Sequence, residues 1–124
     1  MADRVERGRA AHRRGHVAEA AAQAALERDG WSILGARMRT AAGEIDLVAE
    51  KDGLLAIVEV KARPRLVEAA FSLPARQQAR LVAAADILLA EHPAWGTNGV
   101  RFDLLVVDAR GTVRRIKDAF RGEG

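Results

Sequence analysis

The chain has 124 residues, about the size of one compact domain, so a second independent core would not fit. Apolar residues make up 49% of the chain and charged residues 30%, a composition typical of a folded globular protein and not of a disordered one. The absence of cysteine excludes a disulfide framework, a cysteine-ligated zinc site and a catalytic thiol. We therefore expect a single domain over residues 1–124.

The net charge of +3 is modest, but arginine dominates the basic residues and gathers at both ends of the chain, at residues 4–14 and 110–121. Because the guanidinium group binds phosphate bidentately, these ends predict contacts with nucleic acid, although a solvated surface is the simpler interpretation of any single arginine. No stretch approaches the roughly 18 apolar residues of a membrane span, and no apolar leader follows Met1. We expect a cytoplasmic protein that does not bind membranes, and we leave its oligomeric state open, with a homodimer allowed.

Taken in chain order, apolar periodicity and turn residues predict an alternation of helices and strands. A first helix is predicted over 15–29, stopped by Gly30, with Gly8 and Gly15 weakening its continuation toward the amino terminus. The remaining predicted elements are strands over 31–39, 43–50 and 54–62, a second helix from Ser72 and Pro74 to about Glu91, a strand over 100–108 and a short basic strand over 113–117. This order predicts a mixed sheet covered by helices.

A hairpin connects the second and third predicted strands. Asp52 and Gly53 are typical of a two-residue turn, and such a turn pairs residues whose numbers sum to 105. In this register the hairpin has one apolar and one charged face. Two opposite pairs form the apolar face, Ile45 with Val60 and Leu47 with Val58.

The charged face of this hairpin carries the candidate chemistry. Asp46 lies opposite Glu59, where Cβ atoms are about 4.5 to 5.5 Å apart and two carboxylates repel each other unless a cation lies between them. Mg²⁺ or Mn²⁺ suits oxygen ligands of this kind, and Lys61 on the same face can reach a phosphate oxygen or an attacking water. The set predicts a phosphodiester-cleaving site. The alternative is a solvated strand face on which Glu44 and Lys61 form an ordinary cross-strand ion pair.

Both predicted helices direct polar side chains toward the sheet. Glu19 shares the apolar stripe of the first helix, three residues before Ala22, so its carboxylate is expected to point inward. Gln77 heads the apolar stripe of the second helix. It is flanked by Arg76 and Arg80 at a helix amino terminus suited to phosphate.

Two strand motifs are specific, Gly43-Glu44-Ile45-Asp46-Leu47-Val48 and Val58-Glu59-Val60-Lys61-Ala62-Arg63. In these motifs the chain resembles the YraN-like family of predicted endonucleases, relatives of archaeal Holliday-junction resolvases within the restriction-endonuclease-like PD-(D/E)XK superfamily. The likeness covers most of the chain and includes Gly15, Glu19, Arg39, Arg80-Leu81, Ala84-Ala85 and Arg101-Phe102-Asp103. It departs at Met38, where the family often carries asparagine, and at Gln77, where lysine is common.

The resemblance implies an α/β restriction-endonuclease-like fold and a role for each acidic-site residue. By analogy Asp46 and Glu59 hold the metal, Lys61 positions the attacking water and Glu19 completes the acidic site as a further ligand. The side chains expected to contact nucleic acid are Arg39, Arg63, Arg76, Gln77 and Arg80.

Residues and resemblance together predict an endonuclease that uses Mg²⁺ or Mn²⁺ to hydrolyse DNA phosphodiester bonds. Branched DNA and the intermediates of recombination or repair are among its candidate substrates. The alternative is a module of the same fold that binds nucleic acid or a protein partner without cutting it.

Overall fold

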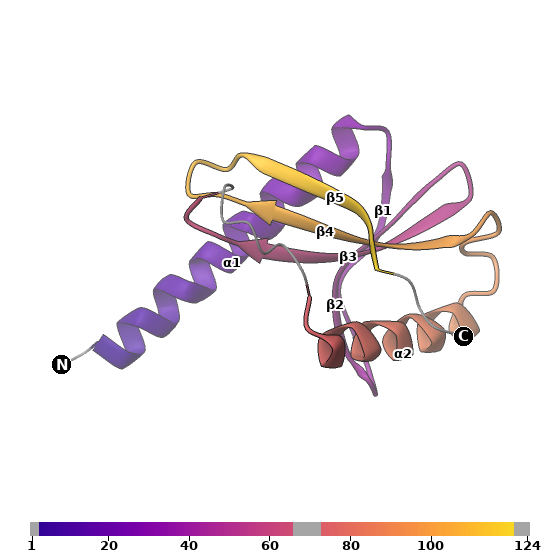
Figure 1. Cartoon of the computed structure of the whole chain (residues 1–124), viewed down its shortest axis with the longest axis horizontal. Helices are drawn as coiled ribbons and strands as arrows, with labels where there is room; N and C mark the ends of the chain where they lie inside the picture. The colour runs from indigo at the N-terminus through magenta and orange to yellow at the C-terminus, as the bar shows by residue number, and fades with distance from the viewer. Residues whose placement is uncertain (1–2, 66–72, 121–124) are drawn as a thin grey trace.

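A computed structural model describes the backbone of residues 3–65 and 73–120, and the side chains in these ranges from Gly15 onward. The elements are α1 (Asp3–Arg28), β1 (Ser32–Thr40), β2 (Gly43–Lys51), β3 (Leu54–Ala62), α2 (Ala75–Glu91), β4 (Val100–Val107) and β5 (Val113–Phe120). One mixed sheet has the order β1-β2-β3-β4-β5, with β3 and β4 parallel and the other neighbours antiparallel (Figure 1). The predicted order and α/β class are confirmed, and the arrangement is consistent with a restriction-endonuclease-like fold.

The first helix is longer than predicted, because α1 is continuous from Asp3 to Arg28. Gly8 and Gly15 each cost about 1 kcal/mol in a helix, but the alanine, arginine and glutamate residues around them favour the helical state. Gly30 ends the helix as predicted, with φ of +88°. The amino-terminal part of α1 extends beyond the sheet (Figure 1). None of the described helices is both long and apolar enough to span a membrane.

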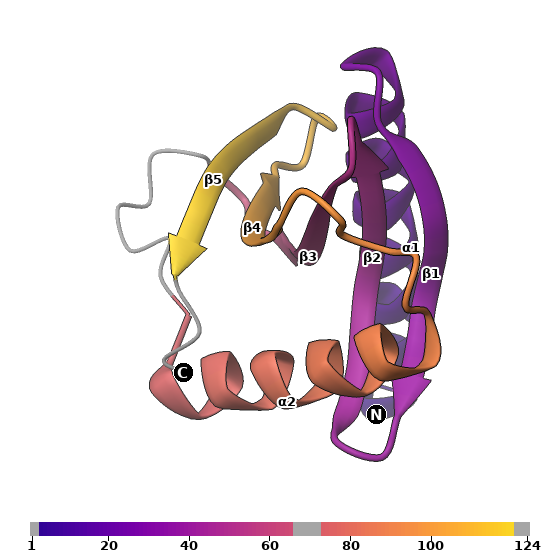
Figure 2. The same ribbon diagram turned by 90° about the vertical axis from the view of Figure 1, so that its right-hand side faces the viewer.

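The sheet separates two apolar cores, one beneath each helix (Figure 2). On the α1 side, Ala18, Ala22 and Leu26 pack against strand residues that include Leu47 and Val58. On the α2 side, the predicted stripe is confirmed, and its buried members are Leu81, Ala84, Ala85 and Leu88. Pro74 occupies the N-cap position of α2 without a side-chain cap, and Ser72 lies outside the described residues.

The β2–β3 hairpin follows the predicted register only in the half next to its turn. Asp52 and Gly53 have φ of +52° and +79°, as a two-residue turn of this kind requires, and the paired residues sum to 105 up to Leu47 with Val58. The backbone ladder ends there. The predicted pairing of Ile45 with Val60 is therefore wrong, since Ile45 packs in the core beneath α2 and Val60 packs against the core beneath α1.

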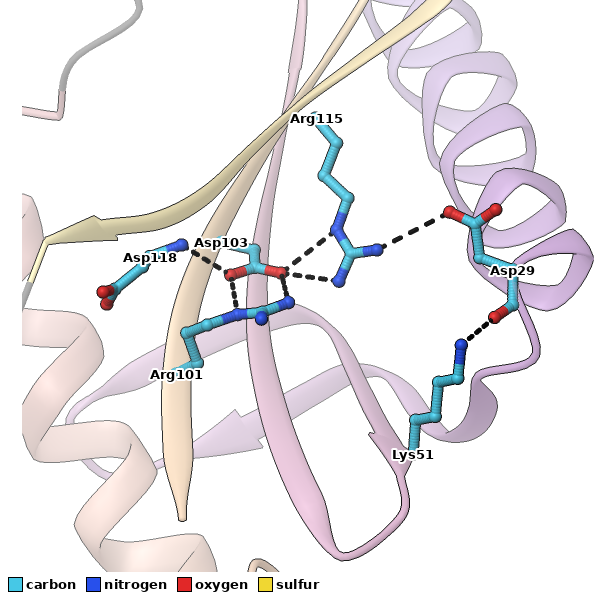
Figure 3. Close-up of polar contacts among 6 residues, drawn as sticks. All are labelled: Asp29, Lys51, Arg101, Asp103, Arg115 and Asp118. Carbon is cyan, nitrogen blue, oxygen red and sulfur yellow. Dashed lines mark hydrogen bonds and ion pairs between the residues drawn. The ribbon is translucent and has the colours of Figure 1, made fainter. Parts of the chain in front are cut away.

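A buried carboxylate ties β4 and β5 to the end of α1 (Figure 3). Asp103 accepts hydrogen bonds from Arg101 at 2.8 and 2.9 Å and from Arg115 at 2.9 and 3.2 Å. Both guanidinium groups lie over the ring of Trp31, and Arg115 also lies 3.7 Å from Asp29, the residue that follows α1. Burial alone would raise the pKa of Asp103. The hydrogen bonds outweigh this effect and hold the pKa below its ordinary value. The cluster fixes the C-terminal strand to the first helix.

Candidate functional site

The two predicted metal ligands meet where the β2–β3 ladder ends. Asp46 and Glu59 lie one residue beyond the last backbone pair, Leu47 with Val58. The carboxylate of Asp46 replaces the missing ladder contact, because its Oδ2 accepts the Val60 backbone N–H at 2.8 Å. The carboxyl groups of Asp46 and Glu59 each influence the pKa of the other, so the two acids form a pair, which we call the acidic pair.

The two oxygens of Glu59 have different surroundings. Oε1 accepts a hydrogen bond from the Gln77 amide at 3.0 Å and lies 3.4 Å from Nζ of Lys61. Oε2 is buried and has no hydrogen-bond donor among the described residues. A hydrogen bond between this oxygen and the carboxyl group of Asp46 forms only if one of the two acids carries a proton and donates it to the other. This oxygen is therefore suited to a proton or to a cation.

The acidic pair is electrostatically strained. Burial raises the pKa of Glu59 to about 7, and the charge of Asp46 adds to the rise while Lys61 opposes it. Burial also raises the pKa of Asp46 above its ordinary value, and the charge of Glu19 contributes to that rise. Two ionised carboxylates at this position consequently require a nearby positive charge beyond that of Lys61.

Glu19 points toward the sheet as predicted, but an arginine of β1 binds it. Nε of Arg37 lies 2.7 Å from Oε2 of Glu19, and its Nη2 lies 2.9 Å from a ring nitrogen of His16. No sequence pattern singles out Arg37, because its backbone conformation and its helix partners arise only in the folded chain. Within the described parts of the chain, no three His, Cys, Asp or Glu side chains are grouped closely enough to hold a metal ion. The role of Glu19 as a further metal ligand stays a prediction.

The predicted phosphate-binding residues of α2 line an open hollow of about 560 Å³ next to the acidic pair. Its walls are Pro74, Arg76, Gln77 and Arg80, and Gln77 connects it to Glu59 through the amide hydrogen bond. The first turn of α2 carries no acidic residue, so the helix dipole and the arginines act together there. Gln77 thus contacts the acidic pair directly, which sequence spacing alone did not indicate.

The other predicted contact residues lie on the exposed rim of the site. Arg39 is exposed, with its Nε 3.6 Å from the carboxylate of Glu44, and Arg63 is exposed and donates to the carbonyl of Ala62. The ion pair of Lys61 is with Glu59, so the Glu44–Lys61 bridge of the solvated-face alternative does not form.

The structure describes the two basic ends of the chain to different extents. The side chains of residues 4–14 and all of residue 121 lie outside the described residues. In the C-terminal group, Arg115 is only 13% exposed and is bound by Asp103, so its predicted availability for phosphate is not supported, whereas Arg110 and Lys117 are exposed.

Comparison with known proteins gives a consistent assignment over most of the chain. The model of the uncharacterised protein family UPF0102 matches residues 18–107, a range that contains the acidic pair. A UPF0102 protein of Granulibacter bethesdensis is 64% identical over 118 residues, which cover 95% of this chain and 75% of that protein. UPF0102 proteins of Azorhizobium caulinodans and Rhodopseudomonas palustris are 47% and 46% identical, over 95% and 90% of this chain and 90% and 85% of those proteins.

Proposed function

This chain belongs to the UPF0102 family, as its strand motifs predicted, and we propose that it is a metal-dependent nuclease that hydrolyses DNA phosphodiester bonds. One observation carries the proposal: Oε2 of Glu59 is buried near Asp46, and no residue in the described part of the chain donates to it. A purely structural position would be more stable with a neutral or apolar residue there. The unsatisfied oxygen therefore supports a binding role for the acidic pair.

The donor set of the acidic pair fits a hard divalent cation such as Mg²⁺ or Mn²⁺. These ions commonly take one or two carboxylates and fill their other positions with waters and substrate phosphate oxygens. Asp46 and Glu59 would hold the ion. When bound, the ion supplies an activated water nucleophile and neutralises charge on a phosphate oxygen.

The remaining residues of the site suit the handling of a phosphodiester. Gln77 and Lys61 both contact Oε1 of Glu59, so Oε2 would be available to a metal ion. The Lys61 side chain is 28% exposed, so its ammonium can also stabilise the charge that develops on the phosphate and the water during attack. Arg76 and Arg80 offer guanidinium donors to the flanking phosphates of the strand.

The test is strand scission with Mg²⁺ or Mn²⁺ on a panel of duplex, single-stranded, flapped and four-way-junction DNAs. We expect wild type to cut at least one of these DNAs, and Lys61→Ala to lower cleavage by at least about 100-fold while affinity in Ca²⁺ changes little. The matched control is Lys51→Ala, which removes an exposed lysine of the same hairpin and should cut normally.

Two results would contradict the proposal. DNA that wild type binds but never cuts, with either metal, would favour the non-cleaving module. Scission that survives both Lys61→Ala and Asp46→Asn would identify a contaminating enzyme, because the site would then have no part in the reaction.

A further inference from the structure

Arg37 has a backbone conformation that an arginine rarely adopts. It lies within β1, and its φ of +52° falls in the left-handed region, which costs a residue with a side chain free energy. Its two chain neighbours pair with Leu47 and Ile45, so Arg37 lies across the ladder from Asp46. Strained residues of this kind tend to occur at functional sites, where the surrounding structure holds them in place.

Two side chains of α1 orient the guanidinium group of Arg37. Nε lies 2.7 Å from Oε2 of Glu19, and Nη2 lies 2.9 and 3.2 Å from the two ring nitrogens of His16. The side chain of Arg37 is nevertheless 36% exposed, and its Nη1 donates to no described residue. The contacts of Nε and Nη2 thus fix one edge of the guanidinium and leave the hydrogens of Nη1 without a described acceptor.

The position of Arg37 complements that of the arginines on α2. Arg37 lies across the β1–β2 ladder from Asp46 and is bound to Glu19, so the Arg37–Glu19 pair lies beside the acidic pair. Arg76 and Arg80 lie on the side covered by α2, whereas Glu19 belongs to the helix that packs on the opposite face. A phosphate backbone crossing the acidic pair would therefore meet a cation on each side.

We infer that Arg37 binds a nucleic-acid phosphate beside the acidic pair, and that Glu19 is a positioning residue for Arg37 and not a further metal ligand. The inference rests on the proposed function. An ordinary surface ion pair contributes about 0 to 1 kcal/mol and gives no reason for the left-handed backbone. A guanidinium held through Nε and Nη2 can still present two N–H groups of Nη1 to a phosphate oxygen, which a lysine in the same place could not reproduce.

The experiment measures two affinities for each variant, that for a labelled DNA duplex in Ca²⁺ across a salt series and that for Mn²⁺ alone by calorimetry. Arg37→Ala should weaken DNA binding about tenfold and lower the slope of log affinity against log salt by about one, with Mn²⁺ affinity unchanged. Arg37→Lys should restore the slope but only part of the affinity. Glu19→Gln should weaken DNA binding and leave Mn²⁺ affinity within about twofold, because a positioning residue does not touch the metal. Arg28→Ala, at an exposed position of α1, is the control.

The outcomes separate this inference from the proposed function. If wild type binds Mn²⁺ and DNA but Arg37→Ala behaves like Arg28→Ala, this inference alone is overturned. A tenfold loss of Mn²⁺ affinity in Glu19→Gln would also overturn it and would make Glu19 a ligand. If wild type binds neither Mn²⁺ nor DNA, both this inference and the proposed nuclease function are overturned. If Arg37→Ala does not fold, Arg37→Gly takes its place in the DNA-binding measurement, because glycine readily adopts the left-handed backbone.

Discussion

Replacing Glu59 with glutamine tests the strained acidic pair without removing its packing. Glutamine keeps an oxygen to accept from Gln77 and Lys61, and its amide nitrogen, in place of the unsatisfied Oε2, can donate to Asp46. The variant therefore removes the carboxylate repulsion and supplies the missing hydrogen bond. We expect the metal-free Glu59→Gln protein to be more stable than wild type at pH 8.

The magnitude follows from the raised pKa of Glu59. Burial and the charge of Asp46 raise this pKa from an ordinary value of 4.5 to about 7, so between these pH values the folded protein keeps a proton that the unfolded chain has released. The stabilisation is complete below pH 4.5 and is lost as the pH rises through 7. At about 1.4 kcal/mol for each pH unit of this window, the loss amounts to roughly 3 kcal/mol.

Urea denaturation in EDTA at pH values from 5 to 8.5 measures the effect. The free energy of unfolding of wild type should fall by up to about 3 kcal/mol across this range, whereas that of Glu59→Gln should fall much less, by the part that Asp46 alone contributes. Glu27→Gln, which neutralises an exposed carboxylate on α1, should retain the wild-type slope. A Glu59→Gln variant with the same pH dependence as wild type would refute the reasoning, because the proton would then be held elsewhere.

Three further predictions use the same stability and calorimetric assays. Asp46→Asn should abolish Mn²⁺ binding and raise the stability of the metal-free protein at pH 8, because it removes the repulsion between the two carboxylates. Unchanged Mn²⁺ binding would show that the acidic pair is not the metal site. Asp103→Asn should lower the free energy of unfolding by about 2 to 4 kcal/mol, because Arg101 and Arg115 lose their buried partner, while exposed Asp86→Asn should change it little. Arg37→Gly should be more stable than Arg37→Ala by about 1 kcal/mol, and equal stability would argue against backbone strain.

The sequence by itself determined those features that depend on neighbouring residues. The Asp52-Gly53 turn set the start of the hairpin register, since both residues accept positive φ. The period of two along a strand placed Glu59 and Lys61 on one face, and the helical period predicted the buried stripe of α2. Motifs in the two strands indicated the family and, with it, the fold class.

Only the tertiary structure decided where the β2–β3 ladder ends, and therefore that Ile45 and Val60 belong to different cores. It likewise decided the partners of the acidic-site residues. The Arg37–Glu19 and Gln77–Glu59 contacts each join residues 18 positions apart on different elements. Such contacts depend on how the helices pack against the sheet, so no local propensity encodes them.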